Sequence, residues 1–330
     1  MMNELYTKYM GLDLRSPLIA GSCNLTDNVA NLKEIEKAGA GAVVLKSVFE
    51  EEIYLEYASE LKKLGPMEDN LEFLDYYDVE IRQDNLKRYL DLIASAKAAL
   101  HIPVIASINC VTSQEWSFFA RKIEAAGADA LELNLFILPS DLRQSSSDNE
   151  NTYFEIIRRV TSQVTIPVSV KISPYFSNLG RMISDISASG IKGMVLFNRF
   201  YSPDIDIDQE IVKSAPKLSS PGDYRLPLRW IGMMASRVEC DLAASTGIHD
   251  WETAVKLMLA GAKTVQLVSL LYKEGFKAIS NFNTRIATWM ETKQYASIDD
   301  FRGKLAMGPQ VNPAEYERVQ FMKTFSEYTR

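Results

Sequence analysis

The chain of 330 residues has only two histidines and three cysteines. So few histidines argue against a His-rich zinc site and leave little room for a Ser-His-Asp triad. Three cysteines in a chain of this length argue against a secreted disulfide scaffold and suit a reducing cytosol. We therefore expect no metal site and no chemistry built on histidine clusters.

The sequence also lacks positive charge and long apolar runs. Its formal net charge is −7, which gives no electrostatic reason to expect nucleic acid or an anionic membrane as a partner. The N-terminus has no apolar core typical of a signal peptide, and no run approaches the ~18 residues that span a bilayer. We expect a cytoplasmic protein that acts on a small molecule.

A repeated pattern is present instead. Four similar segments combine a helix end, a glycine and a short apolar strand, at 37–46, 125–134, 188–198 and 259–268. In two more, at 100–107 and 164–171, a proline precedes the strand, and strand-like runs also occur at Leu18–Gly21 and Asp241–Ser245. Near-continuous apolar strands are typical of a parallel sheet that is covered on both faces.

Amphipathic stretches alternate with these strands, which predicts an α/β fold of the (β/α)8 TIM barrel type. A doubly wound sheet is the rival, but it rarely needs eight such regular units. We expect a single domain over residues 1–330, with an extension at 297–330 packed outside the barrel or against a partner. The predicted helices cover Val29–Ala38, Asp84–Ala99, Ser113–Ala126, Tyr153–Val164, Leu179–Ala188, Leu226–Arg237, Trp251–Ala260 and Phe276–Lys293.

Two long insertions interrupt the repeat, at Phe49–Arg82 and Phe200–Asp223. Each follows a strand and would leave the C-terminal face of the barrel, where barrel enzymes build their active sites. Their length exceeds that of plain connectors, so we expect lids or substrate walls.

Polar residues follow the strands where they would converge on one site. Lys46 and Lys171 each end an apolar strand, and a lysine there is hard to bury without an anionic or electron-rich partner. The run from Ala243 to Thr253 offers small residues before a helix, and Ser269 follows the last strand, as in the phosphate cradles of barrels. The further strand-end residues are Gly21, Ser22, Cys23, Ser47, Ser107, Asn109, Cys110, Asn134, Asn198, Arg199 and Ser245.

At these residues the chain resembles the dihydroorotate dehydrogenase family of FMN-dependent barrels, most closely its soluble and often dimeric class 1 branch. The similarity runs from Tyr9–Gly21 to Asp299–Leu305 and is clearest in Leu45-Lys-Ser47, Glu132-Leu-Asn-Leu135, Val170–Phe176 and Gln266–Gly275. The resemblance implies FMN as cofactor, a CH–CH oxidoreductase of pyrimidine biosynthesis, and a homodimer.

Carried over by position, the resemblance places residues around the flavin. Lys171 would contact the N1–C2 edge and the ribityl chain, where a cation stabilises the anionic reduced flavin. Lys46 would lie near both flavin and substrate. The implied cofactor-binding residues are Ala20, Gly21, Lys46, Ser47, Ser107, Asn134, Lys171, Thr246, Gly247 and Ser269.

The substrate half of the motif set departs from the family. Class 1 members carry Asn-Leu-Ser-Cys-Pro-Asn after strand four, where the cysteine is the base, whereas this chain reads Asn134-Leu-Phe-Ile-Leu-Pro139. The base position falls on Ile137, which cannot accept a proton. Cys110 and Ser140 are substitute candidates, although a buried thiol and a solvated loop are the commoner explanations for each.

The pair after strand six is Asn198-Arg199 where the family has Asn-Ser. Arg199 could bind a substrate carboxylate in a bidentate manner, or it could pair with Asp204 or Asp206. With Lys46 and Asn134, these two residues form the implied substrate site.

Three functions compete. The first is an FMN oxidoreductase of the dihydroorotate dehydrogenase type, acting on dihydroorotate or a related compound. The second is a flavin-binding barrel without dehydrogenase activity, which serves as a binding or regulatory protein. A dihydrouridine synthase is disfavoured by the acidic charge and by the lack of a cysteine near Asn134.

Overall fold

Eight parallel strands form the centre of the molecule. The computed structural model describes residues 5–49, 86–109, 115–199, 203–214, 218–308 and 316–317. The strands pair in the order β4-β3-β13-β12-β9-β8-β7-β6, and a further pairing of β4 with β6 closes the ring into the predicted (β/α)8 barrel. They are β3 (Leu18–Ala20), β4 (Ala42–Val44), β6 (Val104–Asn109), β7 (Ala130–Asn134), β8 (Val168–Ile172), β9 (Gly193–Leu196), β12 (Asp241–Ser245) and β13 (Thr264–Leu267).

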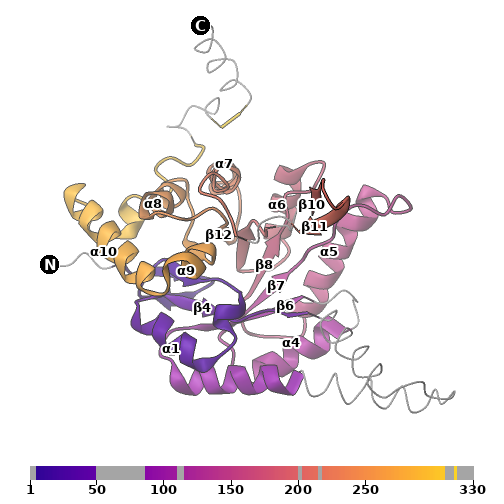
Figure 1. The fold of residues 1–330 in the computed structure, drawn as a ribbon, viewed down its shortest axis with the longest axis horizontal. Helices are drawn as coiled ribbons and strands as arrows, with labels where there is room; N and C mark the ends of the chain where they lie inside the picture. The colour runs from indigo at the N-terminus through magenta and orange to yellow at the C-terminus, as the bar shows by residue number, and fades with distance from the viewer. Residues whose placement is uncertain are drawn as a thin grey trace, which may run out of the picture.

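The helices surround the strands (Figure 1). They lie close to their predicted positions: 86–99, α1 (Val29–Lys37), α4 (Glu115–Ala125), α5 (Ser146–Thr161), α6 (Leu179–Ser187), α7 (Arg225–Met234), α8 (Trp251–Leu259) and α10 (Lys277–Thr292). Short α9 (Ser269–Glu274) follows β13 directly. None of the helices in the described part of the chain combines the length and apolarity needed to cross a membrane.

One helix start differs from the prediction. We expected α5 to begin at Tyr153, but it begins at Ser146. Ser145 caps it, because its side chain accepts from the backbone N–H of Asp148 while the Asp148 carboxylate accepts from Ser145. The polar first turns carry no apolar periodicity, so the pattern indicated only the buried part of the helix.

A hairpin closes the N-terminal end of the barrel. Its strands β1 (Thr7–Tyr9) and β2 (Leu12–Leu14) pair antiparallel. Tyr9, Met10 and Leu14 are buried against apolar residues of the barrel interior, which include Ile19 on β3 and Val195 on β9. The interior of the barrel at this end is therefore a packed apolar core.

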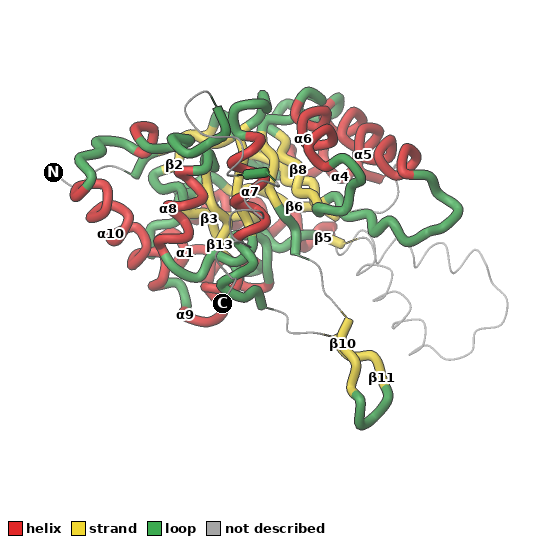
Figure 2. Tube along the Cα trace, turned by 90° about the horizontal axis from the view of Figure 1, so that it is seen from above, coloured by secondary structure: helices red, strands yellow, loops and turns green. Residues whose placement is uncertain are grey.

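The insertions differ in how they relate to the barrel. The first, Phe49–Arg82, lies outside the described residues except for Phe49, which ends β5 (Val48–Phe49). The second contains the antiparallel hairpin β10 (Pro203–Asp206) and β11 (Ile211–Ser214), which projects away from the barrel (Figure 2).

The described residues that follow α10, up to Gly308, pack onto the outer helices. Phe301 is fully buried, and Met307 donates its backbone N–H to the carbonyl of Gly232 on α7. A short η2 turn (Ile298–Asp300) starts this segment.

Candidate active site

A cavity of about 790 Å³ opens at the C-terminal ends of the strands. Most of the residues that line it are polar, and they come from many strands, as expected for the catalytic face of a barrel. Lys46 follows β4, Asn109 ends β6, Asn134 ends β7 and Lys171 lies on β8. Ser47, Phe49, Phe136, Asn198 and Ser269 also line it.

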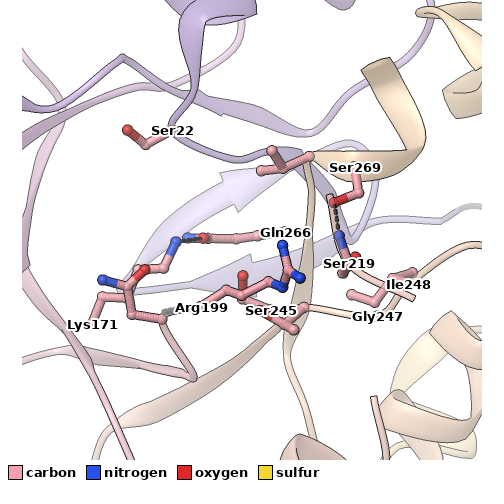
Figure 3. A pocket seen from close by; sticks show the side chains of 12 residues that line it. Ser22, Lys171, Arg199, Ser219, Ser245, Gly247, Ile248, Gln266 and Ser269 are labelled. Carbon is pink, nitrogen blue, oxygen red and sulfur yellow. Dashed lines mark hydrogen bonds between the residues drawn. The ribbon is translucent and has the colours of Figure 1, made fainter. Parts of the chain in front are cut away.

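A smaller cavity of about 130 Å³ adjoins the first. Both are lined by Ser22, Lys171, Asn198, Arg199, Val268 and Ser269, so the two are continuous. Thr246 and Gly247 contribute only to the smaller one, which Figure 3 shows with Lys171 at one side and Gly247 and Ser269 at the other. The site is therefore a long cleft with a narrow end.

Three buried polar side chains form the floor between the cavities. Lys171 Nζ donates to Gln266 Oε1 at 3.0 Å, and Gln266 Nε2 donates to Glu132 Oε2 at 2.6 Å. Lys171 Nζ also lies 4.0 Å from Glu132 Oε1. Alternate residues of β7, β8 and β13 point into the barrel, which brings these side chains together.

Serine hydroxyls line the other side of the floor. Ser47 Oγ lies 2.7 Å from Ser107 Oγ and 3.1 Å from Ser22 Oγ. Ser107 is fully buried and exchanges hydrogen bonds with Tyr89, so it supports Ser47 from behind. Burial of the Tyr89 phenol raises its pKa, which keeps it neutral.

The structure brings most of the predicted cofactor residues to the cleft. Lys46, Ser47, Asn134, Lys171 and Ser269 line the large cavity, and Thr246 and Gly247 line the narrow end. Three others lie behind the walls and not on them: Ala20 and Ser107 are fully buried, and a Cβ on Gly21 would lie only 2.8 Å from Val268 Cγ2.

The narrow end is built by a tight backbone turn. Thr246 and Gly247 have φ values of +81° and +78°, the left-handed region that favours glycine. A Cβ on Gly247 would lie 2.1 Å from the backbone nitrogen of Tyr224, so only glycine fits there. Thr246 holds this conformation at a position where the resembled family has glycine, and its Oγ1 donates to the carbonyl of Phe197.

Ser219, which the sequence analysis did not single out, sits over this turn. Its N–H donates to Ser269 Oγ at 2.9 Å, as Figure 3 shows, and its Oγ lies 2.9 Å from His249 Nε2. Burial and the nearby Lys273 lower the pKa of His249, which favours the neutral ring. Ser219 lies at the end of the second insertion with no motif around it, so only the fold reveals it.

The predicted substrate residues meet in the cleft, with one correction. Asn198 Nδ2 donates to Asn134 Oδ1 at 2.8 Å. Arg199 pairs with Asp223, whose Oδ2 lies 3.8 Å from its Nε, and not with Asp204 or Asp206 as the alternative expected. Asp206 pairs with Lys213 within the projecting hairpin.

The candidate bases have different outcomes. Cys110 lies outside the described residues. Ser140 is exposed on the loop between β7 and α5 and does not line the cleft. Ile137 is half-buried and lines a separate cavity of about 370 Å³, whereas Phe136 faces the large cavity. Cys23 also lines the large cavity, and burial raises its pKa, so it is held as a thiol.

The cleft fits an FMN-sized ligand. A volume of about 790 Å³ lies within the range of cofactor sites. The buried side chain of Lys171 lines the cleft, and the tight turn at Thr246 and Gly247 lines its narrow end. These residues would hold the ring and the phosphate respectively.

Fold and cleft together define a (β/α)8 barrel with a cleft at the C-terminal ends of its strands. The family model described as dihydroorotate dehydrogenase matches residues 68–290, and the chain belongs to this family. The family comprises oxidoreductases that act on CH–CH bonds and are flavoproteins.

Curated relatives cover nearly the full chain at low identity. The catalytic subunit of dihydroorotate dehydrogenase B (NAD(+)) from Thermoplasma acidophilum is 26% identical over 308 residues, which are 92% of this chain and 99% of the relative. The protein of the same description from Thermoplasma volcanium is 24% identical, over 92% of this chain and 98% of its own length. That from Pyrococcus horikoshii is 26% identical, over 91% and 97%.

Proposed function

We propose that this protein is an FMN-dependent oxidoreductase of the dihydroorotate dehydrogenase type. Its substrate would be dihydroorotate or a related small compound. If the substrate is dihydroorotate, the enzyme would act in pyrimidine biosynthesis. The observation that carries the proposal is the Lys171 ammonium, 7% exposed at the floor of a cofactor-sized cleft. A buried cation in such a place suits an electron-rich ligand that becomes anionic on reduction.

When bound, FMN would supply the hydride acceptor at its N5. Lys171 would hold a positive charge beside the ring, and Thr246, Gly247 and Ser269 would bind the phosphate through backbone N–H groups and a hydroxyl. With the ring bound, the walls of the cleft would shield it from water and so strengthen these electrostatic interactions.

The substrate would lie against Asn134 and Asn198. Their mutual hydrogen bond uses Asn134 Oδ1 and one Asn198 N–H, and it leaves the Asn134 amide N–H groups and Asn198 Oδ1 to face a ligand. A cyclic ureide presents both N–H donors and carbonyl acceptors and matches this pair. Lys46 and Arg199 border the same cavity and would bind a carboxylate.

Anaerobic titration tests the proposal. We expect purified protein to be yellow, and we expect excess dihydroorotate to bleach its flavin absorbance within minutes. The matched variant is Asn198→Ala, which should retain the flavin and lose most of the bleaching rate. A flavin that stays oxidised for hours with dihydroorotate would contradict the dehydrogenase proposal.

A flavin-binding barrel without dehydrogenase activity is the second candidate. Phe136 faces the cavity and Ile137 lies beside it, so neither residue of this loop can take a proton from a substrate. Flavin binding without bleaching, together with a change in affinity for another protein on flavin binding, would favour this candidate. If bleaching occurs, Cys110→Ala and Ser140→Ala test the two substitute bases.

We further infer a cytoplasmic homodimer. The acidic charge and the low cysteine content support the compartment, and membership of this family supports the dimer. Light scattering should give twice the mass of the chain, and the monomer mass would contradict the dimer. Mixing the protein with NAD(+) and dihydroorotate tests whether the chain needs a second subunit to pass electrons on.

A further inference from the structure

Glu132 is the buried group that the proposed chemistry does not use. It lies on β7 inside the barrel and is 1% exposed. Its Oε2 accepts from Gln266, while its Oε1 is buried and has no hydrogen-bond partner. A carboxylate in such a place is costly unless a positive charge offsets it. Among the described residues, its counter-charge is Lys171, whose Nζ lies 4.0 Å from Oε1.

Gln266 connects the two charges in a fixed direction. Its amide oxygen accepts from Lys171 and its amide nitrogen donates to Glu132. The reverse orientation would point the amide nitrogen at an ammonium, which cannot accept. The bridge therefore suits an ammonium at one end and a carboxylate at the other. Figure 3 shows Lys171 and Gln266, which form one end of this bridge, among the side chains that line the narrow cavity.

The charge of Glu132 also reaches other buried groups. Burial is the main cause of the raised pKa of both Tyr9 and Tyr89, and the negative charge of Glu132 adds to it in each case. Its field thus extends from the hairpin that closes the barrel up to the wall of the cleft.

We propose that Glu132 is a positioning residue: through Gln266 it holds the Lys171 ammonium at the floor of the cleft, and its charge offsets that ammonium and so lowers the reduction potential of the bound flavin. This inference rests on the proposed FMN site. An uncompensated cation beside the flavin would favour the anionic reduced form more strongly. Glu132 would thereby keep the flavin a weaker oxidant than Lys171 alone would make it.

The first test is the midpoint potential of the bound FMN in Glu132→Gln, which keeps the shape and the hydrogen bond but removes the charge. We expect the reduced flavin to be favoured about tenfold more, which is about +30 mV for a two-electron couple. Glu155→Gln, on the exposed face of α5, is the matched control and should leave the potential unchanged. An unchanged potential in Glu132→Gln would overturn the proposal.

The second test removes the ammonium itself. Lys171→Met should shift the potential in the opposite direction to Glu132→Gln, because it leaves the carboxylate without the cation that it offsets. A shift in the same direction would show that Glu132 does not offset Lys171.

The third test needs no flavin and no activity. Urea denaturation of the apoprotein compares Lys171→Met, Glu132→Gln and the double variant. Because the two buried charges interact, Lys171→Met should lower the folding equilibrium constant about tenfold less in the Glu132→Gln background than in the wild type. Equal losses in both backgrounds overturn the proposal even if the protein binds no FMN, whereas failure of dihydroorotate to bleach the flavin would bear only on the proposed function.

Discussion

The two ends of the barrel are built from the same strands but have opposite interiors. On β7, Ala130 packs in the apolar layer at the N-terminal end, Glu132 belongs to the buried polar bridge, and Asn134 faces the cleft. The residue spacing is the same throughout, because alternate residues point inward along a strand. One end is thus a packed core sealed by a hairpin, and the other is a cleft with buried charges.

This contrast between the two ends indicates that residues at the hairpin end contribute to stability, whereas the buried charges at the cleft end serve function. Apolar side chains buried at the hairpin end stabilise the folded state and need no hydrogen-bond or ionic partners. Burying Glu132, Lys171 and Gln266 gives little net stability, because desolvation of the two charges offsets their attraction. A fold that keeps such groups uses them for something other than stability, and local rules are most often broken at functional sites.

The largest expected effect on the free energy of unfolding is at the N-terminal end of the barrel, which the hairpin closes. Tyr9→Ala removes a fully buried ring from the hairpin and should lower the free energy of unfolding by about 3–5 kcal/mol. Tyr6→Ala, three residues away and 60% exposed, is the control and should change it by less than about 0.5 kcal/mol. Urea denaturation measures both. Equal losses would mean that the hairpin does not seal a core.

At the cleft end, Lys171→Met leaves the Glu132 carboxylate without its nearest counter-charge. We expect a loss of about 3 kcal/mol in stability, with most of it recovered in the Glu132→Met, Lys171→Met double variant. Lys46→Met, at a half-buried strand end of the same cavity, should cost less than about 1 kcal/mol. If both lysine variants lose the same amount, the buried bridge has no special role in stability.

The turn at the narrow end gives a smaller effect. Thr246→Gly and Thr246→Ala both remove the hydroxyl bond to Phe197, but only glycine adopts a φ of +81° without strain. The glycine variant should therefore be more stable than the alanine variant by about 1 kcal/mol. Thermal unfolding of the two compares them directly, and the opposite order would contradict the left-handed conformation.

The smallest effect concerns pH. Because the pKa of His249 is lowered in the fold, the unfolded chain binds a proton first as the pH falls below its ordinary value near 6.5. Stability from this group is therefore present above that pH and declines on acidification towards the lowered value. His249→Asn should flatten the unfolding free energy over this window. A profile that keeps the same slope would exclude His249 as its cause.

Much of the fold was predictable because it depends on local patterns. The Ala-Gly turns before the strands and the amphipathic stretches between them gave the barrel and most of its helices. α5 shows the limit, since its first two turns are polar and are held by the capping of Ser145 with Asp148. Their helical state depends on this cap and on no apolar period.

The candidate site was predictable only in part. Lys46 and Lys171 stood out because charged residues ending apolar strands are unusual. No sequence pattern indicated Ser219, whose N–H donates to Ser269. Arg199 forms an ion pair with Asp223, whereas the sequence suggested Asp204 or Asp206. Both outcomes depend on how the end of the second insertion folds back over the cleft.

By itself, the sequence determined the alternation of strands and helices and the polar residues at the strand ends, because periodicity and glycine turns act over a few residues. Only the tertiary structure decided which polar groups meet. Glu132, Lys171 and Gln266 are far apart in the chain, and closing eight strands into a ring brings them into one buried bridge. Burial strengthens the electrostatic interactions within this bridge, because charges interact more strongly where water is excluded.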